Sequence, residues 1–188
     1  MEEKIRESLE KGEELLWIGS PEQFDTMDKS NGGSIRLGSI IKAVVTVALV
    51  VLYILAAKKN GADIMPVLIV LLVACGGYAI ANPFLTADKL RKKTCYAVTD
   101  RRLITVTSEV KGIPYELIRE AAVRTDADDH STLLCGADAV RAKAGKWRDM
   151  SAYPPRLNSE TGNCDILVFY AVPEMEKVKE LAGQYIAL

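Results

Sequence analysis

Four side chains with the chemistry of a cation site stand close together in the second half of the chain, at Asp126, Asp128, Asp129 and His130. Carboxylate oxygens at such spacing can bind a hard cation. The segment nevertheless lacks the glycine at the sixth position and the glutamate at the twelfth position of an EF-hand calcium loop. A solvated acidic turn is therefore the favoured interpretation, and we expect no metal site.

His130 is also the only histidine in the chain, which leaves little room for a catalytic set. A Ser-His-Asp or Cys-His mechanism would need it as the base, and no GxSxG nucleophile turn is present. Walker and GxGxxG phosphate-binding loops are absent as well. We expect a protein with no catalytic residues and no cofactor.

A second candidate site is a set of basic side chains that begins just after a long apolar segment. Its members are Lys89, Arg91, Lys92, Lys93, Arg101 and Arg102. Near an anionic membrane leaflet each such residue contributes about 1 kcal/mol of attraction, so the set predicts contact with lipid headgroups or with a partner. Two simpler roles stay open. The first four residues can act only as a topology signal, and the arginine pair can form a structural turn capped by Asp100.

Aromatic residues give a third candidate. Trp147 stands among Lys143, Lys146 and Arg148, an arrangement that allows a cation–π contact or an anchor at a membrane interface. Ordinary partial burial of the indole is the simpler interpretation.

The whole chain has 188 residues, with 24 basic and 25 acidic side chains and a formal net charge of −1. This balance excludes a uniformly basic nucleic-acid-binding protein. The balance also hides opposed blocks, because residues 86–111 alone carry seven basic and three acidic side chains. The candidate basic set therefore lies in the most positive part of the sequence.

Two apolar segments, 37–57 and 64–85, contain much of the 49% hydrophobic content. A helix of about 20 residues crosses a hydrocarbon core of about 30 Å, and both segments are that long. Neither has polar residues at helical period, so we expect two transmembrane helices joined by a short link with Asn60-Gly61 as its turn. The alternative is an apolar hairpin buried inside a globular core.

Basic residues favour a cytoplasmic location for both termini. Six of them flank the ends of the segments away from the link, and two, Lys58 and Lys59, lie in the link and argue the other way. The six are Arg36, Lys42, Lys89, Arg91, Lys92 and Lys93. Four cysteines without a CxxC pair agree with a reducing compartment. We therefore expect a cell-membrane protein with two spans.

Small residues in the second apolar segment include Gly77 and Ala81, a small-xxx-small pair that permits close helix approach. Packing against the first segment of the same chain is the favoured role. Formation of a homo-oligomer is the alternative.

The remaining residues predict a mainly β domain. Residues 94–99 and 103–107 are rich in β-branched and aromatic side chains and indicate a hairpin. Further strands are expected at 13–19, 113–123, 132–135 and 165–172, and an amphipathic helix at 173–187. Residues 31–34, Asn-Gly-Gly-Ser, have the composition of a flexible lead into the first span. A small barrel or sandwich closed by the last helix is expected, in a protein that is α+β overall.

Particular phrases in the sequence give a more specific indication. Residues 12–21, GEELLWIGSP, precede the apolar segments, and residues 93–104, KTCYAVTDRRLI, follow them. Together with GIPYELI at 112–118, they resemble the bacterial pleckstrin-homology-like (PH-like) domain proteins. The resemblance implies a membrane protein in which two transmembrane helices are inserted near the N-terminus of a PH-like β-barrel with a C-terminal helix. Residues 124–163 depart from the pattern of that family.

These observations predict the domain organisation. Residues 1–36 form a cytoplasmic segment that contributes a helix and the first strand, 37–57 and 64–85 are the spans, and 86–188 form the PH-like domain. The main functional hypothesis is a non-enzymatic module that is anchored in the bilayer and presents a surface to a protein or an anionic lipid. An accessory or scaffold subunit of a larger membrane complex is the alternative. An enzyme at the membrane surface is the third, and it would need a metal site at the acidic turn.

Overall fold

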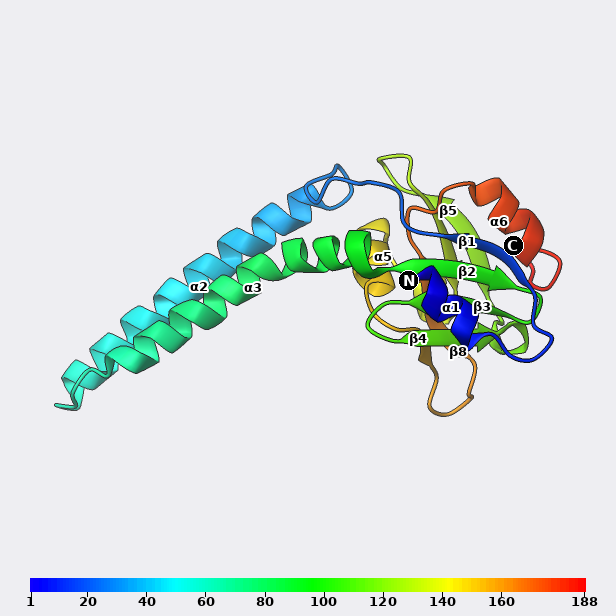
Figure 1. Cartoon of the computed structure of the whole chain (residues 1–188). Coiled ribbons are helices and arrows are strands. Elements are labelled where there is room, and N and C mark those ends of the chain that lie inside the picture. Colours follow the sequence, from blue (N-terminus) through cyan, green and yellow to red (C-terminus); the bar gives the residue numbers. More distant parts are fainter.

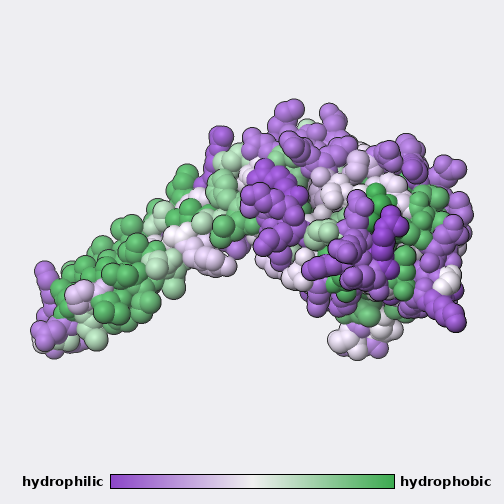
Figure 2. Space-filling view, in the orientation of Figure 1, coloured by the Kyte–Doolittle hydropathy of each residue, from purple (hydrophilic) through white to green (hydrophobic).

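A computed structural model describes residues 1–188, which form a β domain and a long helical hairpin that projects from it (Figure 1). The hairpin consists of α2 (Gly32–Lys59) and α3 (Pro66–Lys93), each of 28 residues. Both helices are long and apolar enough to cross a membrane, and only 6% and 0% of their most apolar stretches is buried. The alternative of an apolar hairpin buried in a globular core is therefore wrong. Figure 2 shows the hairpin as a mostly hydrophobic rod beside a largely hydrophilic domain.

Both helices extend beyond the apolar segments toward the β domain. The α2 helix already begins at Gly32, so residues 31–34 are not a flexible lead. Asn31 precedes the helix, is buried, and donates its backbone N–H to Asp28 Oδ1 at 2.7 Å. The α3 helix continues to Lys93, which places four of the candidate basic residues on a helix rather than on a loop.

The β domain contains two four-stranded antiparallel sheets. The first has the order β1-β2-β3-β4 and the second the order β5-β6-β8-β7. Their strands are β1 (Leu15–Gly19), β2 (Cys95–Thr99), β3 (Arg102–Val106), β4 (Val110–Pro114), β5 (Ala121–Thr125), β6 (Ser131–Cys135), β7 (Arg156–Leu157) and β8 (Cys164–Phe169). Because β1 and β2 are neighbours, the helical hairpin is an insertion between two paired strands.

The sheets do not close into the barrel that the sequence predicts. No ladder joins β4 to β5, and the single strand expected at 113–123 is divided into two. The division occurs at Pro114, which has no N–H to donate and ends β4. A 3-10 turn, Tyr115–Leu117, follows and redirects the chain into the second sheet. The domain is a two-sheet sandwich, the other arrangement expected from the strand pattern.

The main hydrophobic core lies between the two sheets and is closed by helix α6 (Met175–Ala182). Tyr96 of β2 stacks on Phe169 of β8, with ring centroids 4.5 Å apart. Val178 of α6 is completely buried in the same core. The helix expected at 173–187 is thus present in shorter form, and it packs on β2 and β6.

The outer faces of the sheets are covered as well. Helix α1 (Glu2–Ser8) places Ile5 on the outer face of the first sheet. The second sheet is covered by α4 (Ala137–Arg141), α5 (Ala144–Ser151) and the last turns of α3. All five residues of β2 are consequently buried, which accounts for its continuous apolar sequence CYAVT.

Candidate functional site

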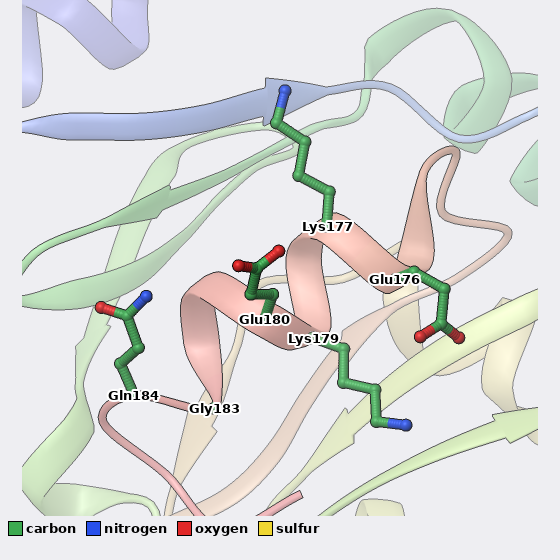
Figure 3. A pocket seen from close by; sticks show the side chains of 6 residues that line it. All are labelled: Glu176, Lys177, Lys179, Glu180, Gly183 and Gln184. Carbon is green, nitrogen blue, oxygen red and sulfur yellow. The ribbon is translucent and has the colours of Figure 1, made fainter.

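One surface depression lies on α6, and its lining does not suggest a ligand. It has a volume of about 620 Å³ and no hydrophobic lining residue. Figure 3 shows that the acidic and basic side chains around it extend outward from the helix in different directions. Such a lining provides neither an apolar floor nor convergent polar groups, which ligand sites usually combine.

A more ordered arrangement lies where the helical hairpin meets the β domain, here called the junction. Residues 20–31 run from β1 to α2 across the outer side of the second sheet. The junction consists of this segment, the start of α2, the end of α3, and α5. The Glu22 N–H donates to the carbonyl of Ala171 at 2.7 Å. The buried ring of Phe24 meets the ring of Tyr170 edge-on, with centroids 5.3 Å apart. The segment is therefore attached to the domain at several points, and Phe24, Thr26, Asp28 and Asn31 are buried.

Two arginines hold this segment in place. Arg91 at the end of α3 donates to the Phe24 carbonyl at 3.1 Å, and Arg148 of α5 donates to the Thr26 carbonyl at 3.0 Å. Both guanidinium groups also lie over the Phe24 ring, at 5.4 and 5.7 Å. Arg148 is only 2% exposed, and its Nη1 lies 3.4 Å from Asp28 Oδ2. The end of α3 and helix α5 are thus tied to the same few residues that lead into α2.

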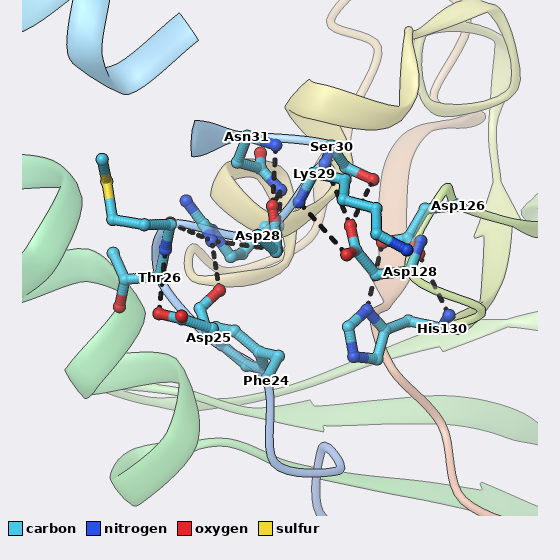
Figure 4. A network of polar contacts seen from close by, with 12 residues as sticks. Phe24, Asp25, Thr26, Asp28, Lys29, Ser30, Asn31, Asp126, Asp128 and His130 are labelled. Carbon is cyan, nitrogen blue, oxygen red and sulfur yellow. Dashed lines mark hydrogen bonds and ion pairs between the residues drawn. The ribbon is translucent and has the colours of Figure 1, made fainter. Parts of the chain in front are cut away.

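The acidic turn, Asp126 to His130, contributes to the same junction (Figure 4). Asp128 accepts hydrogen bonds from the backbone N–H groups of Lys29 and Ser30, at 3.1 and 2.9 Å. Asp126 is buried and accepts from the Tyr170 hydroxyl at 3.0 Å. The favoured interpretation of a solvated acidic turn is therefore wrong for these two carboxylates, because they bind the segment before α2 and the core.

The electrostatics of the turn follow from these contacts. Burial raises the pKa of the Tyr170 phenol, and the neighbouring Asp126 raises it further, so Tyr170 remains a neutral donor. Burial also acts to raise the pKa of Asp128, but the hydrogen bonds from Lys29 and Ser30 outweigh it and lower the pKa. No group of three or more His, Cys, Asp or Glu side chains is arranged to hold a metal ion.

The four basic candidates on α3 point in different directions, because successive helical residues are about 100° apart. Lys92 pairs with Asp88 at 2.8 Å, and Lys89 lies 5.5 Å from the ring centroid of the exposed Tyr153. Lys93 is exposed at the end of the helix, whereas Arg91 is used in the junction. Arg91, Lys92 and Lys93 are therefore exposed, Lys89 is half-buried, and Arg91 alone also binds the junction.

The arginine pair lies elsewhere, at the opposite end of β2. Five strand residues separate it from α3, a distance of about 17 Å. Arg102 is largely buried and binds both carboxylate oxygens of Glu13, at 2.9 and 2.8 Å. Arg101 is half-exposed and donates to the Gly12 carbonyl at 3.2 Å. The structure therefore does not gather the six candidates into one cluster.

The sequence predicted that Asp100 caps the turn that carries this pair, and the structure shows Thr99 in that role. The Thr99 hydroxyl oxygen accepts from the N–H groups of Arg101 and Arg102, at 3.2 and 3.0 Å. Asp100 accepts instead from the Glu14 N–H at 2.9 Å. Thr99 caps the turn because its hydroxyl reaches both N–H groups. Asp100 binds the Glu14 N–H instead and so fixes the segment before β1.

Glu13 gives the first testable prediction. Burial acts to raise its pKa, but hydrogen bonds from Arg102, the Glu10 N–H and Thr99 outweigh that effect and lower the pKa to about 2. A carboxylate whose folded-state pKa is depressed stabilises the fold above its unfolded pKa, and that stability is lost as the pH falls. Between about pH 4.5 and pH 2 we expect the domain to lose on the order of 3 kcal/mol through this group. Urea unfolding of the full chain in neutral detergent, followed by circular dichroism across this range, measures the loss.

Glu13→Gln is the matched control for that measurement. This variant is expected to be less stable at pH 7 and to have a shallower dependence on pH below 4.5. If wild type and Glu13→Gln lose stability in parallel between pH 4.5 and pH 2, the ion pair with Arg102 is not the source of the acid sensitivity.

Inside the hairpin, the single charge of the first apolar segment has a specific partner. Lys42 Nζ donates to the Ala79 carbonyl of α3 at 2.8 Å. That carbonyl is free because the residue four positions later is Pro83, which has no N–H. The sequence contained the signal for this contact, since a lysine in one apolar helix and a proline in the other supply a donor and an unpaired acceptor.

The small residues of α3 are used differently from the expectation. Gly76 is buried, and a Cβ at this position would overlap the Thr46 side chain of α2. Gly77 faces open space, and Ala81 is half-buried. Gly76 therefore provides the close approach within the chain that was assigned to Gly77. A spacing pattern alone does not fix which of two adjacent glycines faces the partner helix, because one residue corresponds to a rotation of about 100°.

Trp147 is buried and donates its Nε1–H to the Ala142 carbonyl at 3.1 Å. Burial is thus its role, and the cation–π partners at the junction are Arg91, Arg148 and Phe24. The sequence analysis did not predict that Arg148 is buried. The spacing of Trp147, Arg148 and Ser151 could have indicated it, because the three residues share the buried face of α5.

Fold and junction together define a class of α+β protein in which an exposed apolar helical hairpin is inserted between paired strands of a two-sheet domain and tied to it by buried arginines. No protein-family model, curated protein or solved structure matches this chain.

Proposed function

We propose that this chain is an integral membrane protein with two spans, whose β domain is a non-enzymatic binding module at the cytoplasmic face. One observation carries the proposal: about twenty large apolar side chains of α2 and α3 are exposed along a hairpin that packs only on itself and the junction. Exposed apolar patches of this size are rare on soluble monomers. A lipid bilayer would bury the apolar surface of a hairpin of this length. The expected partners are the bilayer and either a protein or an anionic lipid.

Several features support a PH-like domain as the finer description. The domain combines two antiparallel sheets around one core with a C-terminal helix that closes it. The phrases WIGSP and YAVTDRR, on which the resemblance rests, fall on β1 with the residues after it and on the β2–β3 hairpin. Their role is structural here, since the second phrase supplies Thr99 and Arg102 for the contacts with Glu13.

The orientation of the domain follows from basic residues and from the position of the termini. Both termini lie in the β domain, at the same end of the hairpin (Figure 1). The exposed Lys92 and Lys93 and the half-buried Lys89 lie in the last turns of α3, where the helix leaves the apolar zone. At this height a cytoplasmic, anionic leaflet attracts them, which supports a cytoplasmic domain and an outer tip at residues 60–65.

Cysteine labelling tests this topology. In whole cells, Asn60→Cys is expected to react with a membrane-impermeant maleimide, and Glu3→Cys is expected to react only after the membrane is opened. Both positions are exposed, so lack of reaction does not reflect burial. Of the native cysteines, Cys95, Cys135 and Cys164 are buried, and unmodified protein provides the background. Reaction of Glu3→Cys from outside the cell would reverse the proposed orientation.

A second function is favoured by one observation on α3. Gly77 is exposed within the apolar zone and has open space beside it, so a helix of another chain has room to approach closely there. This arrangement supports an accessory or scaffold subunit of a larger membrane complex, or a homo-oligomer.

A further inference from the structure

A cavity of about 230 Å³ lies at the junction, between the start of α2, the proline of α3 and the first turns of α5. We propose that this cavity holds the phosphate group of an anionic phospholipid, with Lys42, Lys146 and Arg148 as the cationic groups around it. The inference rests on the proposed membrane function and names a ligand for it.

The charges that line the cavity favour an anion. Lys42 comes from α2, and Lys146 and Arg148 come from α5. Two acids oppose them, Asp149 in the lining and Asp28 beside Arg148. Three bases against two acids leave an excess of positive charge in a region that the bilayer partly shields from water, where such an excess acts more strongly than on an open surface.

Hydrogen-bond donors in the cavity are left without acceptors. All the contacts of the Arg148 guanidinium with the Asp25–Asp28 segment are made by Nη1, and Arg148 itself lines the cavity. A phosphate oxygen is a fitting acceptor for a guanidinium N–H that is not used by this segment, because hydrogen bonds between two charged groups are the stronger ones. Lys42 donates to one acceptor, the Ala79 carbonyl, although an ammonium group has three donors.

The start of α2 adds neutral donors. Ser34, which carries a hydroxyl, lines the cavity and is the third residue of the 28-residue α2, whose first N–H, that of Gly32, donates to the Asp28 carbonyl at 2.7 Å. The first turn of α2 contains no acidic residue, so the positive end of the helix dipole is not neutralised from within the helix. Gly38 in the lining has open space beside its backbone.

The depth of the cavity matches that of a lipid headgroup. Along α2, Lys42 lies about 27 Å and Gly38 about 33 Å from the turn at Asn60. A hydrocarbon core of about 30 Å that starts at this turn therefore ends between these two residues. The cavity spans that boundary, with Lys42 and Pro83 on the membrane side and the α5 residues on the domain side.

Size and surroundings favour a lipid over a free anion. A volume of 230 Å³ is smaller than the roughly 300–1,000 Å³ of pockets for larger ligands, so it suits a phosphate with a short attachment. Exposed apolar side chains of α2, such as Leu37 and Ile41, provide a surface for acyl chains at the same height. Inorganic phosphate has the same oxyanion chemistry but gains nothing from that surface.

Binding of short-chain lipids to the purified full chain in neutral detergent tests the proposal. The probes are dihexanoyl phosphatidylglycerol, dihexanoyl phosphatidylcholine and inorganic phosphate, each titrated by calorimetry. We expect binding of phosphatidylglycerol to exceed that of the other two. Lys146→Gln should weaken phosphatidylglycerol binding about fivefold. Lys143→Gln, an equal charge change at an exposed position outside the cavity, should weaken it by no more than about twofold.

Ser34→Phe is the second variant, because it fills the cavity from an exposed position without changing charge. It should abolish the preference for phosphatidylglycerol over phosphatidylcholine. Equal effects of the two lysine variants, no preference between the two lipids, or inorganic phosphate bound as tightly as phosphatidylglycerol would each overturn the lipid assignment. Alkaline carbonate extraction of the same proteins separates the two levels: a chain that stays in membranes without lipid preference contradicts only this inference, and a chain that is released contradicts the proposed function.

Discussion

Arg148→Ala is expected to lower the free energy of unfolding of the β domain by about 3–5 kcal/mol. The guanidinium is 2% exposed, and its removal would leave the buried carboxylate of Asp28 without its cationic partner and the Thr26 carbonyl without a donor. Breaking a buried pair from one side is costly, because the remaining charge stays in a low-dielectric site. Urea unfolding of the full chain in neutral detergent, followed by circular dichroism, measures the change.

Two further variants make this prediction specific. Lys146→Ala removes a cation two positions away on the exposed face of the same helix, and it should change the stability by less than about 0.5 kcal/mol. Arg148→Met combined with Asp28→Asn removes both charges and should recover part of the loss. If Arg148→Ala and Lys146→Ala have the same effect, Arg148 does not hold the junction together.

The sequence predicted the fold where local signals are strong. The two apolar segments, the hairpin of β2 and β3, and the last helix all come from periodicity and composition that neighbouring residues provide. The single strand expected at 113–123 is wrong because Pro114 lies inside the run and ends β4, after which a 3-10 turn leads into the second sheet. The prediction of a closed barrel was also wrong. Closure depends on pairing between particular strands, and no pairing joins β4 to β5.

The candidate site was harder to predict, because the partners of the basic residues are far away in sequence. Arg102 binds Glu13, 89 residues earlier, and Arg148 binds Thr26, 122 residues earlier. The sequence suggested a headgroup contact or a structural turn for Arg102 and only a place beside Trp147 for Arg148, whereas the folded chain buries both against carboxylates and carbonyls. Lys92 and Lys93 have no such long-range partners and are exposed, as their sequence context indicates.

Both connections between the hairpin and the β domain are rigid, and this bears on how the protein works. The α3 helix ends at Lys93, and β2 begins at Cys95 with only the buried Thr94 between them. The other connection, residues 20–31, is fixed by Arg91, Arg148 and Asp128. A domain joined in this way keeps one orientation to the hairpin. Under the proposed function, a binding surface on the domain is then held at a set height and angle to the membrane.

Gly76→Leu is expected to separate the two helices of the hairpin and to lower its stability by about 1–3 kcal/mol or more. Any side chain at Gly76 would overlap Thr46, a short side chain that cannot swing away, and α2 and α3 would have to move apart. The neighbouring hydrogen bond from Lys42 to the Ala79 carbonyl lies one turn further along α3, and it should lengthen or break with them. Unfolding in mixed micelles with increasing SDS, followed by circular dichroism, measures the loss.

Gly77→Leu is the matched control, because the same substitution one position later enters open space. In a monomer it should leave the hairpin stability unchanged within about 0.5 kcal/mol. Chemical crosslinking in native membranes gives the second reading: if α3 contacts another chain through this face, Gly77→Leu removes the crosslinked species while the hairpin stays folded. Equal destabilisation by the two leucines would contradict the packing register described for α2 and α3. An unchanged crosslinking ladder for Gly77→Leu would contradict an assembly through this face and leave the anchored module as the proposed function.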